Sequence, residues 1–257
     1  MTKPSFRVVI PARYASSRLP GKPLLPLAGR PLVLRVWDVG VQSSASEVLV
    51  ATDDARIADC VRSGGGHVVL TRADHATGTD RLAEVADLRG YADDDVVVNL
   101  QGDEPFVPPS VLEDLARALV DHPDAGIATM ATPIRTREEL FEPSVVKTVL
   151  DRAGYAHYFS RAPIPWVRGD FERGLVDEPL PAVAPFLRHL GLYAYRVGTL
   201  RTLRAASMSP AETAESLEQL RAMHLGIRIH VTVIPDAPGR GVDTPEDLER
   251  ASKLFER

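Results

Sequence analysis

Short apolar runs alternate with amphipathic stretches throughout the first half of the chain. The runs are rich in β-branched residues, and the amphipathic stretches carry apolar side chains three and four positions apart. Such alternation with short connections predicts βαβ units and a mostly parallel sheet with helices on both faces. The predicted strands are 6–10, 47–51, 67–70, 95–100 and 126–132, and the predicted helices are 32–42, 55–63, 79–88 and 109–120.

The pattern changes at about residue 143. A hairpin is predicted over 147–150 and 155–159, and the proline-rich stretch 162–185 that follows shows little periodicity. An excursion of this size commonly serves function or an interface. We therefore expect one domain over 1–257, with roughly 150–205 as an inserted subdomain. The remaining predicted elements are a strand at 189–195, a helix at 211–225 with Leu217, Leu220 and Leu225 as its core stripe, a strand at 228–234 and a helix at 245–256.

Length, charge and cysteine content exclude several classes of protein. A compact chain of 257 residues buries enough surface to fold without a disulfide or a structural metal. The single cysteine, Cys60, argues against a disulfide framework and a zinc site. A net charge of −5 offers no field that would attract nucleic acid. With no membrane-length apolar run and no signal-peptide pattern, we expect a soluble cytoplasmic protein that binds neither nucleic acid nor membrane.

The first predicted strand leads directly into the basic loop Pro11-Ala-Arg-Tyr-Ala-Ser-Ser-Arg-Leu-Pro-Gly-Lys-Pro-Leu24. Its cations Arg13, Arg18 and Lys22 suit a polyanion bound at the carboxyl end of a parallel sheet. The spacing fits neither a Walker A motif nor G-x-G-x-x-G, so side-chain cations rather than a glycine cradle would hold the phosphates. A solvated basic loop is the alternative interpretation.

Two further loops place carboxylates where the same sheet edge is expected. Asp103 and Glu104 follow the strand at 95–100. Carboxylates beside phosphate-binding cations make physical sense around a divalent cation, and magnesium takes one or two of them. Asp103 is the first predicted ligand, with turn chemistry at Gly102-Asp103 as the alternative.

The second predicted magnesium ligand is Asp243. The residues after it, Thr244 to Asp247, are explained as a helix start with Thr244 as the N-cap and acids in the first turn. Asp243 itself is not explained in this way. Glycines at 239 and 241 let the backbone before it approach a ligand closely.

Nucleotide and acceptor contacts are expected from other segments. Arg72 and Gly78, just before the helix 79–88, could meet a base or phosphates, although Thr77 or Thr79 as a plain helix cap explains the same segment. A second, anionic substrate would be bound by residues of the later half. One candidate is Arg161, and two more are His189 and Tyr193, which lie on one face of an alternating strand. The last two are Glu218 and Gln219, whose alternative interpretation is a solvated helix face.

With these motifs assembled, the chain closely resembles the 3-deoxy-manno-octulosonate cytidylyltransferases (CMP-Kdo synthetases) almost from end to end. Several motifs in the family's order are far more specific than any one of them. In the nucleotide half they are the basic loop, Ala51-Thr-Asp-Asp54, Thr71-Arg-Ala-Asp-His75, Gly78-Thr-Asp-Arg-Leu-Ala-Glu84 and Asn99-Leu-Gln-Gly-Asp-Glu-Pro105. In the rest they are Phe159-Ser-Arg-Ala162, Ile164-Pro-Trp166, Arg188-His-Leu-Gly-Leu-Tyr193, Leu217-Glu-Gln-Leu-Arg221 and Gly241-Val-Asp-Thr-Pro-Glu-Asp-Leu248.

The resemblance implies a three-layer, Rossmann-like nucleotide-diphospho-sugar transferase fold with a mixed, mostly parallel sheet, and a homodimer formed through the inserted subdomain. It implies the reaction of CTP with Kdo to give CMP-Kdo and pyrophosphate, with magnesium, as in lipopolysaccharide biosynthesis. Lys22, Asp103 and Asp243 would be catalytic, the two aspartates as metal ligands. By matching positions, the nucleotide would be bound by Arg13, Ser16, Arg18, Lys22, Arg72, Gly78 and Gln101, and the sugar acid by Gln101, Arg161, His189, Tyr193, Glu218 and Gln219.

Two stretches depart from the family pattern. Val167 stands where an acidic residue is common, and the helix start at 209–213 lacks the expected leucine and histidine. Both changes surround the expected sugar pocket, so transfer to another acidic sugar, such as 8-amino Kdo or a nonulosonic acid, is an alternative. A catalytically inactive nucleotide-binding regulator is a further alternative, although a pure binder has no need for two metal carboxylates.

Overall fold

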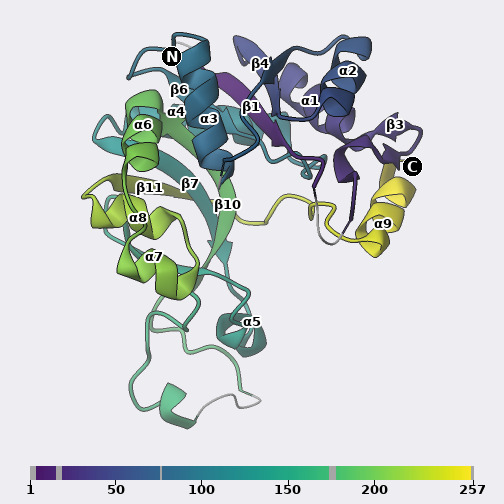
Figure 1. Cartoon of the computed structure of the whole chain (residues 1–257). Coiled ribbons are helices and arrows are strands. Elements are labelled where there is room, and N and C mark those ends of the chain that lie inside the picture. Colours follow the sequence, from purple (N-terminus) through teal and green to yellow (C-terminus); the bar gives the residue numbers. More distant parts are fainter. Residues whose placement is uncertain (1–3, 16–18, 76, 174–177, 256–257) are drawn as a thin grey trace.

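A nine-stranded sheet runs through the middle of the molecule, with helices on both faces (Figure 1). The computed structural model describes residues 4–15, 19–75, 77–173 and 178–255. The main strand order is β11-β7-β10-β6-β1-β4-β5, and β8 and β9 continue from β10. Within the residues described, no helix is both long and apolar enough to cross a membrane.

The first half of the chain forms a parallel sheet, which confirms the predicted alternation of strands and helices. β1 (Arg7–Ala12) pairs with β4 (Glu47–Thr52) and β6 (Val96–Asn99), and β4 pairs with β5 (Val68–Leu70). The predicted ends shift by one or two residues at most. The helices are α1 (Leu32–Gln42), α2 (Ala55–Ser63), α3 (Gly78–Leu88) and α4 (Pro109–Asp121), and the basic loop adds the 3-10 helix η1 (Lys22–Leu24) and a hairpin of β2 (Pro26–Leu27) and β3 (Arg30–Pro31).

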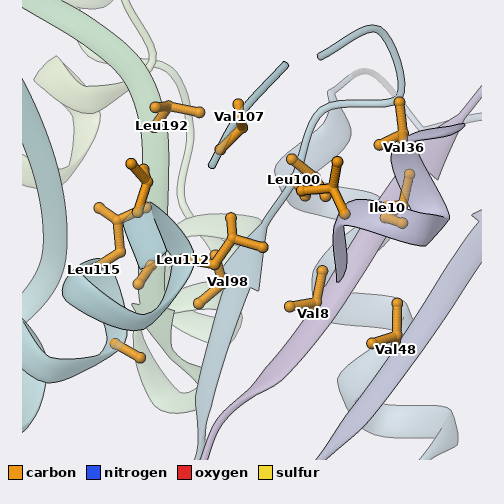
Figure 2. Close-up of a cluster of buried hydrophobic side chains, with 14 of the residues drawn as sticks. Val8, Ile10, Val36, Val48, Val98, Leu100, Val107, Leu112, Leu115 and Leu192 are labelled. Carbon is orange, nitrogen blue, oxygen red and sulfur yellow. The ribbon is translucent and has the colours of Figure 1, made fainter. Parts of the chain in front are cut away.

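Alternate residues of the central strands enter two different apolar layers. Val8 and Ile10 of β1 belong to a buried cluster with Leu112 of α4, whereas Val9 belongs to a second cluster with Leu82 of α3. Figure 2 shows the first of these layers, where side chains of β1 and β6 lie with those of α4. Because both faces of the sheet are covered, its central strands are apolar on both sides of the pleat.

β10 (Leu187–Arg196) runs against the direction of its neighbours. It lies between β6 and β7 (Ala125–Pro133) and is antiparallel to both, while β11 (Arg228–Val233) pairs with β7 in parallel. Tyr193 of β10 is paired with Asn99, the last residue of β6. The residues before Tyr193 therefore lie beyond the carboxyl end of β6, at the edge where open α/β sheets bind their ligands.

Beyond the end of β7 the chain forms a segment that extends the sheet and then projects away from it around α5 (Figure 1). It contains the predicted hairpin of β8 (Lys147–Leu150) and β9 (Ala156–Ser160), and two helices that were not predicted, α5 (Arg137–Phe141) and the 3-10 helix η2 (Phe171–Arg173). A third apolar cluster holds the segment together, formed by Ile134, Leu140, Phe171 and Phe186.

Lys147 fixes the base of this segment. Its side chain is fully buried, and its ammonium donates to the carbonyl oxygens of Glu142 (3.0 Å), Val145 (2.6 Å) and Arg161. A buried ammonium needs such partners, because an unpaired charge in the interior is strongly unfavourable. Lys147 is therefore structural, and its three acceptors join the loop before β8 to the end of β9.

The prediction of one continuous helix over 211–225 is wrong. α7 (Pro210–Glu215) ends at Ser216, whose φ of 52° lies in the left-handed region, and α8 (Gln219–His224) begins anew at Gln219. The break changes which residues face the core: Gln219 is buried at 7% exposure, whereas Leu225 is 41% exposed. α6 (Val197–Ala205), which was not predicted, packs on α3, and α9 (Pro245–Phe255) lies against β2 near the end of the chain.

We expect His230 to make folding sensitive to acid. Burial and the neighbouring His122, whose ring stacks on it at 3.6 Å between centroids, lower the pKa of His230 to about 4, although Asp151 acts in the opposite direction. The unfolded chain, with an ordinary pKa near 6.5, then binds a proton that the folded chain does not. The free energy of unfolding should therefore fall as pH drops from about 6.5 to 4.

The change His230→Gln should remove about 1–3 kcal/mol of that pH dependence, measured by urea unfolding at pH 7.5 and pH 5. The exposed His224→Gln is the matched control. Identical pH dependence in the wild type and His230→Gln would contradict the expectation.

Candidate active site

Lys22 joins the two predicted metal ligands at the carboxyl edge of the sheet. Its Nζ lies 2.6 Å from Asp103 Oδ2 and 3.1 Å from Asp243 Oδ1. Lys22 begins η1 directly after Gly21, whose φ of 69° gives the sharp bend that a side chain would oppose. Asp103 lies in the turn after β6, and Asp243 precedes α9. Three loops that are remote in sequence thus meet at one ammonium.

The charges of this cluster stabilise one another. Burial tends to lower the pKa of Lys22, but the charges and hydrogen bonds of Asp103 and Asp243 outweigh burial and raise the pKa above its ordinary value of 10.5. The lysine is therefore fully charged at neutral pH. One positive charge faces two negative charges, so the cluster can accept a further cation.

The two carboxylates fit a magnesium ion. Both approach the same ammonium from different loops, so they converge on a position that one cation can share. Among the side chains that the structure describes, no group of three or more histidine, cysteine and acidic residues could hold a metal alone. Magnesium does not need such a group, because phosphate oxygens and water complete its octahedron.

A cavity of about 380 Å³ opens above the cluster. Arg13 lines it at the end of β1, and its Nη2 atom is buried without a hydrogen-bond partner. Gly78, the first residue of α3, and Gln101 also line it, so backbone N–H groups at a helix start face the same space. The backbone N–H donors of this helix start and the cations Arg13 and Lys22 suit the phosphates of a nucleoside triphosphate.

Gly102 lets the β6 turn approach the end of β1. A Cβ atom at Gly102 would lie 2.8 Å from the backbone oxygen of Pro11, closer than real Cβ contacts allow. We expect Gly102→Ala to lower the free energy of unfolding by about 1–3 kcal/mol, because a backbone must shift. Gly78→Ala is the control, since its Cβ would meet Pro11 at an ordinary 3.6 Å. Equal melting temperatures for the two variants would refute this account of the turn.

Among the described residues, one predicted nucleotide ligand, Arg72, is not found in the cavity lining. Ser16 and Arg18 lie outside the described residues. Arg72 lies in an exposed turn, where its guanidinium pairs with Asp74 at 3.0 Å and its backbone N–H donates to Glu84. Thr77 instead caps α3 through a capping box with Asp80, in line with the alternative interpretation of this segment as a helix cap.

A second cavity of about 560 Å³ lies along the start of β10. His189 and Tyr193 line it with their rings 5.4 Å apart, and Gln219 lines it from α8. Burial lowers the pKa of His189 to about 3 and raises the pKa of Tyr193 well above its ordinary value. Both side chains are therefore neutral at physiological pH, and His189 is oriented by Thr129, with 3.0 Å between Nε2 and Oγ1. Neutral hydrogen-bonding groups of this kind suit the hydroxyl groups of a sugar.

The other predicted sugar ligands do not line this cavity. Gln101 lines the nucleotide cavity instead. The Arg161 guanidinium donates to the carbonyl oxygens of Glu215 (2.7 Å) and Pro143 (3.0 Å), which ties β9 to α7. Glu218 accepts a hydrogen bond from Thr77 Oγ1 at 3.2 Å, so it joins α8 to the start of α3. These contacts give Arg161 and Glu218 structural roles.

A third, smaller cavity of about 220 Å³ adjoins the second, with which it shares Arg188, His189, Gly191 and Arg240. Glu104, the neighbour of Asp103, and Gly241, close to Asp243, form one wall, and His189 forms another. Glu104 Oε2 is buried without a hydrogen-bond partner. Burial and then the charges of Asp103 and Asp243 raise the pKa of Glu104 to about 8. Through Glu104, this cavity lies next to the cluster of Lys22, Asp103 and Asp243, which lines the first cavity.

Comparisons with known proteins identify the family of this chain. The sequence model of the cytidylyltransferase family matches residues 7–229. A relative from Pseudomonas syringae pv. tomato, named 3-deoxy-manno-octulosonate cytidylyltransferase, is 52% identical over 252 residues, covering 98% of each chain. One of the same name from Halorhodospira halophila is 53% identical over 256 residues, covering 100% of this chain and 99% of its own. The chain belongs to the family of 3-deoxy-manno-octulosonate cytidylyltransferases.

Solved structures confirm the fold predicted for this family. A structure of CMP:2-keto-3-deoxy-manno-octonic acid synthetase complexed with CTP has a TM-score of 0.87 and 43% identity, covering 98% of this chain and 99% of its own. A cytidylyltransferase from Leptospira borgpetersenii shares the fold at a TM-score of 0.61 and 17% identity, covering 98% of this chain and 87% of its own.

The departures from the family pattern lie away from the acceptor cavity. Asp170 pairs with the buried Arg137 inside the projecting segment. Thr213 is exposed on α7, and neither Val167 nor Ala211 lines the cavity. Among the described residues, none of these changed positions lines the acceptor cavity, where a contact could select a different sugar. Glu104, the neighbour of the predicted ligand Asp103, does line the 220 Å³ cavity.

Proposed function

We propose that this protein transfers CMP from CTP to the anomeric hydroxyl of Kdo, giving CMP-Kdo and pyrophosphate. The observation that carries the proposal is the cluster of Lys22, Asp103 and Asp243, which lines one cavity together with Arg13, while a second cavity carries His189, Tyr193 and two arginines. The names of the relatives, which match along the whole chain, point to the same reaction. Because CTP is consumed, we infer a cytoplasmic location, which cell fractionation would test.

Catalysis of this kind depends mainly on positioning and on charge neutralisation. Arg13 and Lys22 would bind the triphosphate, together with Ser16 and Arg18, and would balance charge as pyrophosphate leaves in line. Asp103 and Asp243 would hold magnesium, which would supply Lewis-acid stabilisation of the phosphates. Gly78 and Gln101 would keep the nucleotide at the edge of the sheet.

On the acceptor side, His189, Tyr193 and Gln219 would orient the sugar. His189 is uncharged at neutral pH, because burial lowers its pKa to about 3, so it acts by hydrogen bonding. The sugar would enter through the 560 Å³ cavity and reach the α-phosphorus past Glu104. No side-chain nucleophile is needed, since the sugar hydroxyl itself attacks phosphorus.

Pyrophosphate release from CTP and magnesium tests the proposal, with Kdo, 8-amino Kdo, N-acetylneuraminate or no sugar as the acceptor. Release with Kdo alone is expected. Release only with another acid would keep the transfer and replace the acceptor. Folded protein that binds CTP but releases pyrophosphate with none of them would overturn the proposal in favour of a regulatory binder.

We also propose that the chain forms a homodimer through the inserted subdomain, 150–205. An apolar groove of about 710 Å³ lies there, and Val183 beside it is 74% exposed. Exposed apolar surface of this kind is typical of an interface.

Sedimentation equilibrium should give twice the chain mass of 28.0 kDa, and Val183→Glu should shift the mass toward that of one chain. A monomeric wild type at micromolar concentration would refute the dimer. The groove is lined chiefly by Pro133, Ile134, Val149, Leu150, Pro165, Leu180, Pro185, Phe186 and Leu187.

A further inference from the structure

Arg240 lies at the candidate site, but it belongs neither to the sequence motifs quoted above nor to the cluster of Lys22, Asp103 and Asp243. It lies in the connection between β11 and α9, which crosses from the sheet toward the basic loop in Figure 1. It lines both the 560 Å³ cavity and the 220 Å³ cavity, together with His189 and Gly191. Its side chain is therefore at the junction where an acceptor would pass.

The backbone on both sides of Arg240 is held in place. A Cβ atom at Gly239 would lie 2.7 Å from Phe106 Cβ, and one at Gly241 would lie 3.1 Å from the backbone oxygen of Asp103. The N–H of Val242 donates to that same oxygen at 2.8 Å. The loop is thus packed against the turn that carries Asp103, and the position of Arg240 is coupled to the position of the metal ligands.

Arg240 differs from the other arginines near this cavity in its bonding. Arg188 pairs with Glu139 at 3.4 Å, and Arg161 donates to two backbone carbonyls. In the described part of the chain, by contrast, no residue accepts a hydrogen bond or forms an ion pair with Arg240, which is exposed. Of these three guanidinium groups, that of Arg240 is the one left available to a ligand.

The electrostatics of the junction require a cation for an anionic acceptor. Glu104 forms part of the wall of the 220 Å³ cavity beside Asp103, and Lys22 supplies one positive charge against the two aspartates Asp103 and Asp243. A carboxylate approaching this wall would be repelled unless a positive charge met it. A guanidinium does so well, because its fork of donors matches the two oxygens of a carboxylate.

We propose that Arg240 binds the carboxylate of the acid sugar and is a specificity-determining residue for the acceptor. This assignment rests on the proposed function. It replaces Arg161, the cation that the sequence analysis expected to meet the sugar, because Arg161 is engaged by backbone carbonyls. The neutral side chains of His189 and Tyr193 then hydrogen-bond to the hydroxyl groups of the sugar, and the charge of Arg240 distinguishes an acidic sugar from a neutral one.

The test is steady-state kinetics of Arg240→Gln and Arg240→Lys, with the exposed Arg62→Gln on α2 as the matched control. Arg240→Gln should raise KM for Kdo about 10- to 100-fold, the loss of a charged hydrogen bond. KM for CTP, the affinity for CTP by titration calorimetry and the melting temperature should stay within experimental error of the wild type. Arg240→Lys should be intermediate, because it keeps the charge and loses the fork. Arg62→Gln should match the wild type.

Two results would overturn the assignment. An unchanged KM for Kdo in Arg240→Gln would show that the guanidinium does not contact the acceptor. An equal rise in KM for CTP and for Kdo, or a clear fall in melting temperature, would show that Arg240 merely supports the loop. Neither result would affect the proposed function, which fails only if the wild type releases no pyrophosphate with Kdo.

Discussion

Replacing Asp103 with asparagine should lower kcat by roughly 10³-fold or more while the protein stays folded. Asp103 contributes a full negative charge to the cluster, and its Oδ2 is 2.6 Å from Lys22. An amide keeps the shape but coordinates magnesium poorly, and the loss of several kcal/mol of transition-state stabilisation corresponds to this factor. The measurement is pyrophosphate release at saturating CTP and Kdo across a magnesium titration.

The controls for Asp103→Asn separate charge from folding. Asp59→Asn changes an exposed aspartate on α2 and should behave like the wild type. Asp243→Asn should resemble Asp103→Asn, because both carboxylates converge on one cation. Activity within twofold of the wild type for Asp103→Asn, with unaltered magnesium dependence, would rule out its role as a metal ligand.

Lys22→Met should lower kcat by about 10²-fold, the range found when one charged stabilising group is lost from a preorganised site. Methionine keeps the apolar stem and removes only the ammonium. The two carboxylates would then lose the cation that they share, so the free energy of unfolding should also fall by about 1 kcal/mol without magnesium. Kinetics and urea unfolding, each with and without magnesium, measure both effects.

Lys253→Met, on the exposed face of α9, is the control for the loss of one lysine charge. It should change neither quantity. If Lys22→Met kept full kcat and full stability, Lys22 would be a solvated lysine, and the basic loop would lose its assigned function.

The order of strands and helices could be predicted because it depends on local patterns. The run at 96–99 is apolar on both pleat faces, and α1 and α2 have apolar residues at helical spacing, so their bounds were predicted within two residues or better. The basic loop and the two aspartates were equally visible, since each follows or precedes a predicted element. The continuous helix over 211–225 was wrong, because a left-handed residue at Ser216 leaves no mark in hydrophobic periodicity, and α5, η2 and α6 were missed.

The sequence by itself determined the parallel half of the sheet and the residue types that gather at its carboxyl edge. The tertiary structure decided which of them meet. Lys22 and Asp243 are 221 positions apart and touch only because η1 and the loop before α9 pack on the β6 turn. The reversed direction of β10 brings His189 to the same edge, and packing engages Arg161 while leaving Arg240 available. Periodicity reports which face of an element is buried, whereas contacts between remote loops depend on strand order and direction, which no local pattern encodes.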